Sequence, residues 1–336
     1  MPEKSYTSSF RKEKNFFGVE ILTAGYAAIT SVMVIVLWNR LDNPGSFLLA
    51  RMLIVSGMLL AYSAASLLDF VPATTLVRIL FSVGLITYWY PETYEFNKVF
   101  ENLDHVFASA EQSIFGFQPA LAFSKHFSSK WISEAFYMGY FFYFPMMMFV
   151  VLHCFFYQRE KFDRLTFIFL GSFFLYYFLF IFIPVTGPQF YFPVIGTENV
   201  ENGIFSNVGN YFYYNSELLP VSGYGDGLFS RCVRMLQAMG ERPTAAFPSS
   251  HVGISTILMI WLYENNKRIM FIVFPLYALL CGATVYIKAH YLIDVFAGFT
   301  SAFAFYGLFA LSFDKLYGRR GSAETGSPDP TKQTII

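Results

Sequence analysis

Two histidines and one aspartate near the carboxyl end of the chain have the types and spacing of a phosphoryl-transfer site. His251 follows the stretch Phe247-Pro248-Ser249-Ser250, and His290 stands four residues before Asp294. Residues four apart lie on one face of a helix. An acid that holds one imidazole nitrogen fixes the tautomer and leaves the other nitrogen nucleophilic. We therefore expect His251, His290 and Asp294 to share one site at the water side of a bilayer.

The residues before His251 are typical of a helix start. Pro248 precedes Ser249 and Ser250, whose hydroxyls can cap the first free N–H groups of a helix. Those free N–H groups also bind anions. The sequence therefore predicts that Ser249 and Ser250 bind a phosphate group beside His251.

Three other interpretations of these residues stay open from the residues alone. The two stretches could be helix caps with incidental histidines, although ionisable groups in membrane spans are costly and usually functional. Two histidines and an aspartate could instead bind zinc. A Ser–His–Asp hydrolase could use Ser249 or Ser250, but adjacent Ser and His point poorly at each other on a helix, and the sequence has no GxSxG turn. We expect no metal ion and no cofactor.

Composition indicates that these residues belong to a membrane protein. Of the 336 residues, 55% are apolar and 14% are charged, whereas soluble domains carry about 25% charged residues. The net charge of zero argues against a nucleic-acid binder. The cysteines Cys154, Cys232 and Cys281 form no CxxC pair and indicate neither a disulfide framework nor a zinc site.

Apolar runs predict an all-α integral membrane protein with about eight transmembrane helices. A hydrocarbon core of about 30 Å requires ~20 apolar residues per helix. The first run is longer than a signal-peptide core and lacks a clear cleavage site, so we expect the mature protein to keep it. The third run is the least typical of a membrane span, because it contains the charged residue Arg78. The runs cover residues 17–39, 46–68, 72–90, 132–155, 164–185, 249–264, 268–288 and 291–312.

Basic residues predict the direction in which the chain crosses the membrane. With a cytoplasmic N-terminus, the cytoplasmic side receives the basic residues near both chain ends and those at 159–164 and 267–268, as the positive-inside rule requires. The helix starts at His251 and His290 then face the other side. We expect a multi-pass protein of a bacterial inner membrane with an extracytoplasmic active site; a Golgi-type membrane is the second candidate.

The chain divides into four parts. Residues 1–90 hold the N-terminal spans, and residues 91–131 carry apolar residues at helical spacing, which is typical of an amphipathic segment at the membrane interface. Residues 132–314 form the predicted catalytic core, with a long extracytoplasmic loop at 187–247. Residues 315–336 are expected to be a disordered cytoplasmic tail, because most of this segment is rich in Ser, Thr, Pro and Gly.

The stretches around the two histidines resemble the second and third signatures of the type 2 phosphatidic acid phosphatase/haloperoxidase superfamily. Those signatures read Pro-Ser-Gly-His and Ser-Arg-x5-His-x3-Asp, and the resemblance extends over roughly residues 130–312. It implies a six-helix catalytic core. It also implies that His290 is the nucleophile that attacks phosphorus, that Asp294 orients it, and that His251 is the general acid and then the general base.

Departures from these signatures point to one branch of that family. Ser250 replaces the glycine of the second signature, and Ala283 and Thr284 replace the Ser-Arg pair of the third. The first signature, Lys-x6-Arg-Pro, is missing at its usual place, where residues 186–191 read Thr-Gly-Pro-Gln-Phe-Tyr. This pattern is similar to inositol phosphorylceramide synthases and related sphingolipid head-group transferases, in which the two histidines and the aspartate are kept while the arginines drift.

A phosphate group still requires partners for its charge, because electrostatic stabilisation dominates phosphoryl transfer. The candidates are Arg242, Lys288 and Gln189, together with the N–H groups near Ser249 and Ser250. Lys288 could instead extend its amine to the membrane interface.

The sequence therefore supports three hypotheses about function. The first is a lipid phosphotransferase that moves a phospho-head group, such as inositol phosphate, from a phospholipid to a ceramide-like lipid alcohol through a phosphohistidine. The second is a lipid phosphate phosphatase with water as acceptor. The third is a non-enzymatic membrane scaffold or carrier that only binds lipid. Nothing in the sequence fixes the oligomeric state.

Overall fold

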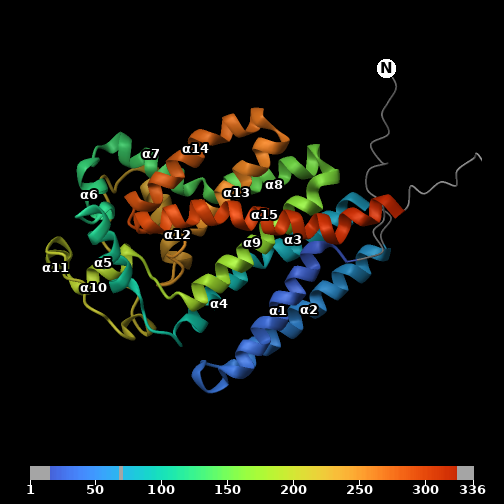
Figure 1. Cartoon of the computed structure of the whole chain (residues 1–336), viewed down its shortest axis with the longest axis horizontal. Coiled ribbons are helices and arrows are strands. Elements are labelled where there is room, and N and C mark those ends of the chain that lie inside the picture. The colour runs from blue at the N-terminus through green and yellow to red at the C-terminus, as the bar shows by residue number, and fades with distance from the viewer. Residues whose placement is uncertain (1–15, 68–70, 324–336) are drawn as a thin grey trace, which may run out of the picture.

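A bundle of helices makes up the whole of the described structure. This computed structural model describes residues 16–67 and 71–323, and every regular element in these ranges is a helix. The expected all-α class is confirmed. Two long helices run side by side along one flank of the molecule, and the remaining helices gather beside them (Figure 1). The N-terminal elements are α1 (Gly18–Val36), the short η1 (Trp38–Arg40), α2 (Pro44–Leu67), α3 (Val71–Gly84) and α4 (Ile86–Asn97).

Two buried ion pairs join these first helices to one another. Arg78 of α3 donates to both carboxylate oxygens of Glu20 in α1, at 2.8 and 2.6 Å. Arg51 of α2 donates to both carboxylate oxygens of Glu92 in α4, at 2.8 Å each. Two parallel charge-assisted bonds make a charge tolerable inside an apolar bundle. This pairing explains how an apolar helix accommodates Arg78.

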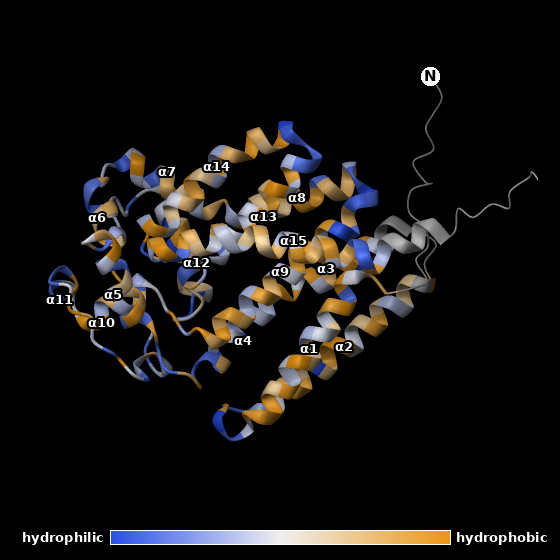
Figure 2. Ribbon diagram, in the orientation of Figure 1, coloured by the Kyte–Doolittle hydropathy of each residue, from blue (hydrophilic) through white to orange (hydrophobic). Residues whose placement is uncertain are grey.

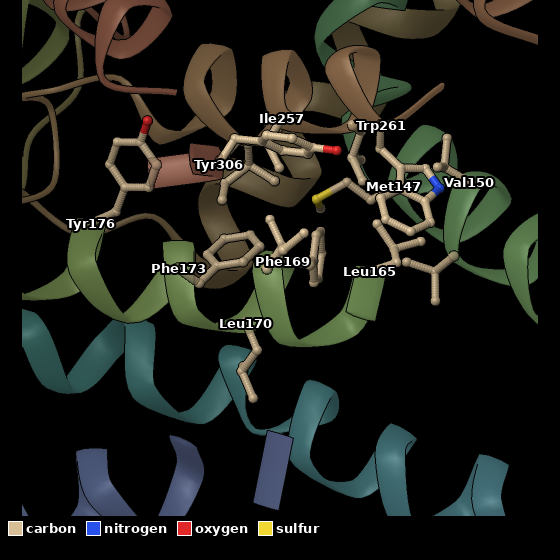
Figure 3. Close-up of a cluster of buried hydrophobic side chains, with 14 of the residues drawn as sticks. Met147, Val150, Leu165, Phe169, Leu170, Phe173, Tyr176, Ile257, Trp261 and Tyr306 are labelled. Carbon is tan, nitrogen blue, oxygen red and sulfur yellow. The ribbon is translucent and has the colours of Figure 1, made fainter. Parts of the chain in front are cut away.

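The part of the chain that carries His251 and His290 is built around α9. This helix is apolar on all sides, and most of its side chains are buried, as expected of a central helix. Figure 3 shows its side chains packed against those of α8, α13 and α15. The core helices are α7 (Lys130–Phe141), α8 (Tyr143–Tyr157), α9 (Phe162–Phe182), α13 (Ser250–Asn265), α14 (Lys267–Tyr286) and α15 (Leu292–Ala323), with η2 (Arg159–Lys161) before α9.

Short helices cover one end of this core. The segment at 91–131, which the sequence predicts to lie at the membrane interface, contains helices, and the long segment at 187–247 also contains helices between its irregular stretches (Figure 1). These two segments meet the ends of α9, α13 and α15, where the candidate site lies. Their elements are α5 (Asp104–Phe115), α6 (Pro119–His126), α10 (Pro188–Ile195), α11 (Thr197–Glu201), η3 (Tyr211–Tyr213) and α12 (Leu228–Gly240).

Six of the eight predicted spans correspond to helices that could cross a membrane. Five helices are long and apolar enough, and α7 with α8, bent by 45°, forms a sixth candidate. Figure 2 shows apolar residues along α1 and α2, where they face outward. The predicted span at 72–90 divides near Leu85 into α3 and α4. The one at 249–264 forms α13, whose 16 residues fall short of a full span.

The predicted tail begins later than expected. The last helix, α15, continues to Ala323, so the disordered tail predicted from residue 315 is wrong for its first residues. Two hydrogen bonds between helices explain part of this extension. Arg164 of α9 donates to both carboxylate oxygens of Asp314 in α15, at 2.9 and 3.0 Å. The rest of the predicted tail, 324–336, lies outside the described residues.

Candidate active site

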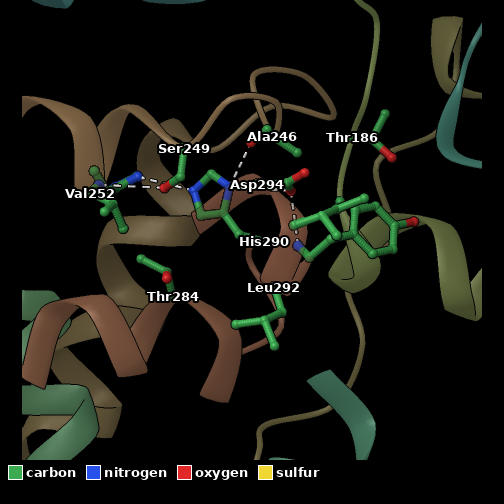
Figure 4. Close-up of polar contacts among 12 residues, drawn as sticks. Thr186, Ala246, Ser249, Val252, Thr284, His290, Leu292 and Asp294 are labelled. Carbon is green, nitrogen blue, oxygen red and sulfur yellow. Dashed lines mark hydrogen bonds and ion pairs between the residues drawn. The ribbon is translucent and has the colours of Figure 1, made fainter. Parts of the chain in front are cut away.

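His290 lies in the short connection between α14 and α15 and is held at both its backbone and its ring. Its backbone N–H donates to the carbonyl of Thr284 at 3.1 Å. Its ring Nδ1 lies 2.7 Å from the carbonyl oxygen of Ala246 (Figure 4). A carbonyl can only accept, so Nδ1 carries the proton and Nε2 keeps its lone pair. The imidazole is therefore presented as a nucleophile through Nε2.

His251 stands directly in front of that lone pair. It is the second residue of α13, and its Nδ1 lies 3.3 Å from Nε2 of His290. The His251 ring stacks on Tyr140, with centroids 4.9 Å apart, and lies 4.5 Å from the Tyr143 ring. Because the Nε2 of His290 accepts, Nδ1 of His251 is the donor in this pair. The structure thus brings the two predicted histidines together, with a donor nitrogen of His251 facing an acceptor nitrogen of His290.

Asp294 lies beside His290, but it is not the nearest partner of the ring. Its Oδ2 is 3.7 Å from Nδ1 of His290 and accepts a bond of 2.9 Å from the N–H of Tyr291. The shorter bond to Nδ1 comes from Ala246, which the sequence did not single out. In this structure, Ala246 therefore fixes the tautomer, and the buried Asp294 carboxyl group lies beside the ring.

Burial keeps the His290 ring neutral at physiological pH. The side chain is 3% exposed, and this desolvation lowers the pKa of His290 to about 4, although the Ala246 carbonyl and the nearby Glu241 carboxylate partly oppose the shift. A neutral imidazole is the form that can attack phosphorus. The pKa therefore agrees with the nucleophilic role expected from the sequence.

The same pKa predicts a loss of stability in acid. His290 binds a proton at about pH 6.5 when unfolded and only near pH 4 when folded. The stability that is present above pH 6.5 should therefore be lost as the pH falls from 6.5 to 4, by on the order of 3 kcal/mol. Thermal unfolding in detergent between pH 7.5 and 4.5 measures this slope. His290→Asn should flatten it, and equal slopes in both proteins would contradict the assignment.

The two predicted phosphate-binding serines have different surroundings. Ser249 is fully buried, its hydroxyl accepts from the Val252 N–H at 3.4 Å, and its own N–H donates to the carbonyl of Asp294 at 3.0 Å. It therefore caps α13 and fastens that helix to α15. Ser250 is partly exposed, and its N–H lies in the first helical turn, which has no earlier carbonyl within the helix to bond. The first turn of α13 is thus the available anion site.

The other predicted phosphate partners do not converge on the histidines as free charges. Arg242 is exposed at the surface. Lys288 is buried, and its amine donates to the Ser222 hydroxyl at 2.8 Å. Its backbone has φ of +66°, a left-handed conformation that is unusual for a residue with a side chain. The Gln189 amide donates to the carboxylate of Glu241, so it is already engaged.

The position of the missing third-signature arginine is filled by apolar packing. Ala283 and Thr284 are fully buried in α14. The Thr284 hydroxyl donates to the carbonyl of Cys281 in its own helix at 2.9 Å. Its carbonyl accepts from the N–H of His290, so this turn still positions His290 while adding no positive charge.

Asp104 is a structural partner of the site that lies outside both histidine stretches. This fully buried residue at the start of α5 accepts from the N–H and hydroxyl of Thr186, at 2.7 and 2.8 Å, and from the N–H of Gly187 at 2.9 Å. It also accepts from the phenol of Tyr291 at 3.0 Å and from the amide of Asn102 at 2.7 Å. Asp104 therefore ties the segment after α9 to the residue next to His290.

Glu111 is a second acid that positions the site from α5. Its carboxylate accepts from the N–H groups of Leu292 and Ile293, at 2.6 and 3.3 Å, at the start of α15. Burial and the nearby Asp294 raise the pKa of Glu111 to about 7. No local signal in the sequence could have found it, since it lies about 180 residues from the helix that it caps.

Removing this cap should weaken the start of α15. Glu111→Ala leaves two partly buried N–H groups without an acceptor and should cost about 1–2 kcal/mol of stability. Glu111→Gln keeps an acceptor oxygen and should cost less. Thermal unfolding of both variants in the same detergent measures the difference. Equal stability of the Ala and Gln proteins would show that the cap contributes nothing.

A family comparison covers the two histidines and most of their partners. The family model described as PAP2 superfamily matches residues 105–308, which include both histidines, Asp294 and all the core helices from α7 to α14. No curated protein and no solved structure matches the chain. Since the matched segment exceeds half of the chain and contains the paired histidines, the chain belongs to the PAP2 superfamily, whose members are phosphatases or phosphotransferases.

Proposed function

We propose that the protein is a lipid phosphotransferase that moves a phospho-head group from a phospholipid to a ceramide-like lipid alcohol through a phosphohistidine. The observation that carries this proposal is the geometry of the histidine pair. Nδ1 of His290 is fixed by Ala246 at 2.7 Å, and its Nε2 faces Nδ1 of His251 at 3.3 Å. This pair lies beside the N-terminus of α13, where free N–H groups favour an anion.

In the first half of the reaction, the Nε2 lone pair of His290 attacks phosphorus. The bond from phosphorus to the diacylglycerol oxygen breaks, and His251, in its doubly protonated form, delivers a proton to that leaving oxygen and becomes neutral. The phosphoryl oxygens are stabilised by the first turn of α13, at Ser250 and His251. The two rings must separate to admit phosphorus, because the 3.3 Å between their nitrogens holds no phosphoryl group.

In the second half, His251 acts as a base. It removes the proton from the hydroxyl of the acceptor, whose oxygen attacks phosphorus while the bond to Nε2 of His290 breaks. General acid–base catalysis of this kind contributes about 10²–10⁴-fold. The same residues would serve a phosphatase, in which water takes the place of the lipid alcohol.

The charge around the histidines favours a phosphodiester donor. A phosphate monoester carries up to two negative charges and requires more compensation than a diester, which carries one. Arg242 is exposed, Lys288 is bound to Ser222, and the neighbouring Glu241 is an acid whose carboxyl group accepts from Gln189. The resemblance of residues 283–290 to sphingolipid head-group transferases adds support for a lipid alcohol as acceptor. In this proposal the site opens on the extracytoplasmic side of a bacterial inner membrane.

Reconstitution with a labelled phospholipid tests the proposal. We expect transfer of the labelled head group to ceramide, inhibited by vanadate, which mimics five-coordinate phosphorus, and undiminished by EDTA. A labelled product that forms at the same rate without ceramide, as the free head-group phosphate, would assign the phosphatase reaction instead. Absence of any phospholipid turnover would contradict both enzymatic functions.

A further inference from the structure

Three polar side chains form a cluster at the end of α12 that the reaction above does not use. Glu241 follows α12, Gln237 lies in its last turn, and Gln189 lies in α10. The Gln189 amide donates to the Glu241 carboxylate, and the Gln237 amide donates to the Gln189 side-chain oxygen at 3.1 Å. We call these residues the amide–carboxylate cluster.

The cluster adjoins the histidine pair. The Gln189 N–H donates to the carbonyl of Lys288 at 2.8 Å, two residues before His290. The Glu241 carboxylate interacts electrostatically with His290, and also with the phenol of Tyr140, whose ring stacks on His251. A head group that is attached to a phosphorus atom between the two histidines would therefore extend toward Glu241.

The charge of Glu241 has no cationic partner. In the described ranges, the lysine and arginine ion pairs all involve other acids, and Glu241 takes part in none of them. The side chain is only partly buried, so one side of it remains open to a ligand. A partly buried carboxylate without a cation costs stability, and a purely structural position at the end of α12 would be served by a neutral residue.

Oxygen acceptors and amide donors are the groups that recognise hydroxyls. A carboxylate accepts strongly from a hydroxyl, and an amide can both donate and accept. The same carboxylate repels a second phosphate charge. We propose that the amide–carboxylate cluster is the head-group subsite and selects a hydroxyl-rich polyol joined through a phosphodiester. This inference rests on the proposed phosphotransferase function, whose donor it specifies.

Binding of soluble head groups tests the subsite without turnover. The full chain with His290→Ala is placed in lipid nanodiscs, and dissociation constants are measured for inositol 1-phosphate and for inorganic phosphate. We expect inositol 1-phosphate to bind at least tenfold more tightly. Glu241→Gln in the same background should reduce that preference about tenfold or more, because a hydrogen bond to a charged acceptor contributes roughly 1.5–3 kcal/mol.

A matched control separates this effect from a change in net charge. Glu217→Gln removes the same charge from an exposed position of the same loop and should keep the preference. Glu241→Asp, which keeps the charge but shortens the side chain, should give an intermediate preference, and it substitutes for Glu241→Gln if that protein does not fold. An unchanged preference in the Glu241 variants, or an equal affinity of the parent for both ligands, would overturn the subsite.

Failure of this inference and failure of the proposed function give different results. Turnover of the wild-type protein on phospholipid is measured in parallel. Turnover with no polyol preference overturns the subsite alone. A polyol preference without turnover supports the subsite and contradicts the phosphotransferase.

Discussion

The His290→Ala protein should transfer phospho-head groups roughly 10⁴-fold more slowly than the wild type, or slower still, because the attacking nitrogen is gone. No other described group can replace it. The Nδ1 of His251 points to His290 and its ring is confined by Tyr140 and Tyr143. The rate of product formation in nanodiscs, with substrate above saturation, measures this loss.

An exposed histidine provides the matched control. His126, at the end of α6, is exposed, and its ring meets the ring of its neighbour Phe127 edge to face. His126→Ala should retain the wild-type rate. If His290→Ala kept more than about a tenth of the wild-type rate, a covalent mechanism through this residue would be untenable.

The second large effect is expected at Asp104, which acts through other residues. Asp104→Ala removes the acceptor of the Thr186 and Gly187 N–H groups and of the Tyr291 phenol. Each buried donor left unpaired costs about 1–3 kcal/mol, so the variant should lose roughly 3 kcal/mol or more of stability. Because Tyr291 adjoins His290, we also expect the maximal rate to fall more than the apparent affinity for the donor lipid.

Thermal unfolding measures the loss of stability. Separate values of kcat and KM show whether the maximal rate falls more than the apparent affinity for the donor lipid. Asp226→Ala serves as a control, since Asp226 is exposed in the long loop and should be neutral in both assays. Asp104→Asn places an amide among donors and should be nearly as harmful as Asp104→Ala. A stable and fully active Asp104→Ala protein would show that the hydrogen bonds at Thr186 and Tyr291 do not position the site.

The candidate catalytic residues could be found from local sequence patterns. His290 and Asp294 share a helix face because they are four apart, and the start of α13 is encoded by Pro248 and Ser249. The pairing of the two histidines, 39 residues apart, followed from the family signatures that both stretches resemble. The structure places their nitrogens 3.3 Å apart.

The partners of these residues could not be found in the same way. Ala246 holds His290 through a backbone carbonyl, which every residue possesses, so its identity carries no signal. Asp104 and Glu111 act across distances of more than 80 residues in the chain. Their importance comes from burial, which appears only when the helices pack. Gln189 was expected to bind phosphate, and the structure instead engages it with Glu241.

The span pattern shows a similar limit. Hydropathy located the long helices correctly, but it could not show that the run at 72–90 divides into α3 and α4. Nor could it show that Arg78 and Arg51 each meet a glutamate from another helix. Pairing across helices decides whether a charge is tolerated in an apolar bundle, and pairing is a property of the packed structure.

The covalent intermediate tests the central claim most directly. The wild-type protein in nanodiscs is mixed with donor phospholipid without acceptor, quenched in alkali, in which phosphohistidine survives, and digested for mass spectrometry. The proposal predicts a peptide with the phosphorylated head group on Nε2 of His290, which disappears when ceramide is added before the quench. A head group attached to His251, Ser249 or Ser250, or turnover with no labelled peptide at all, would contradict it.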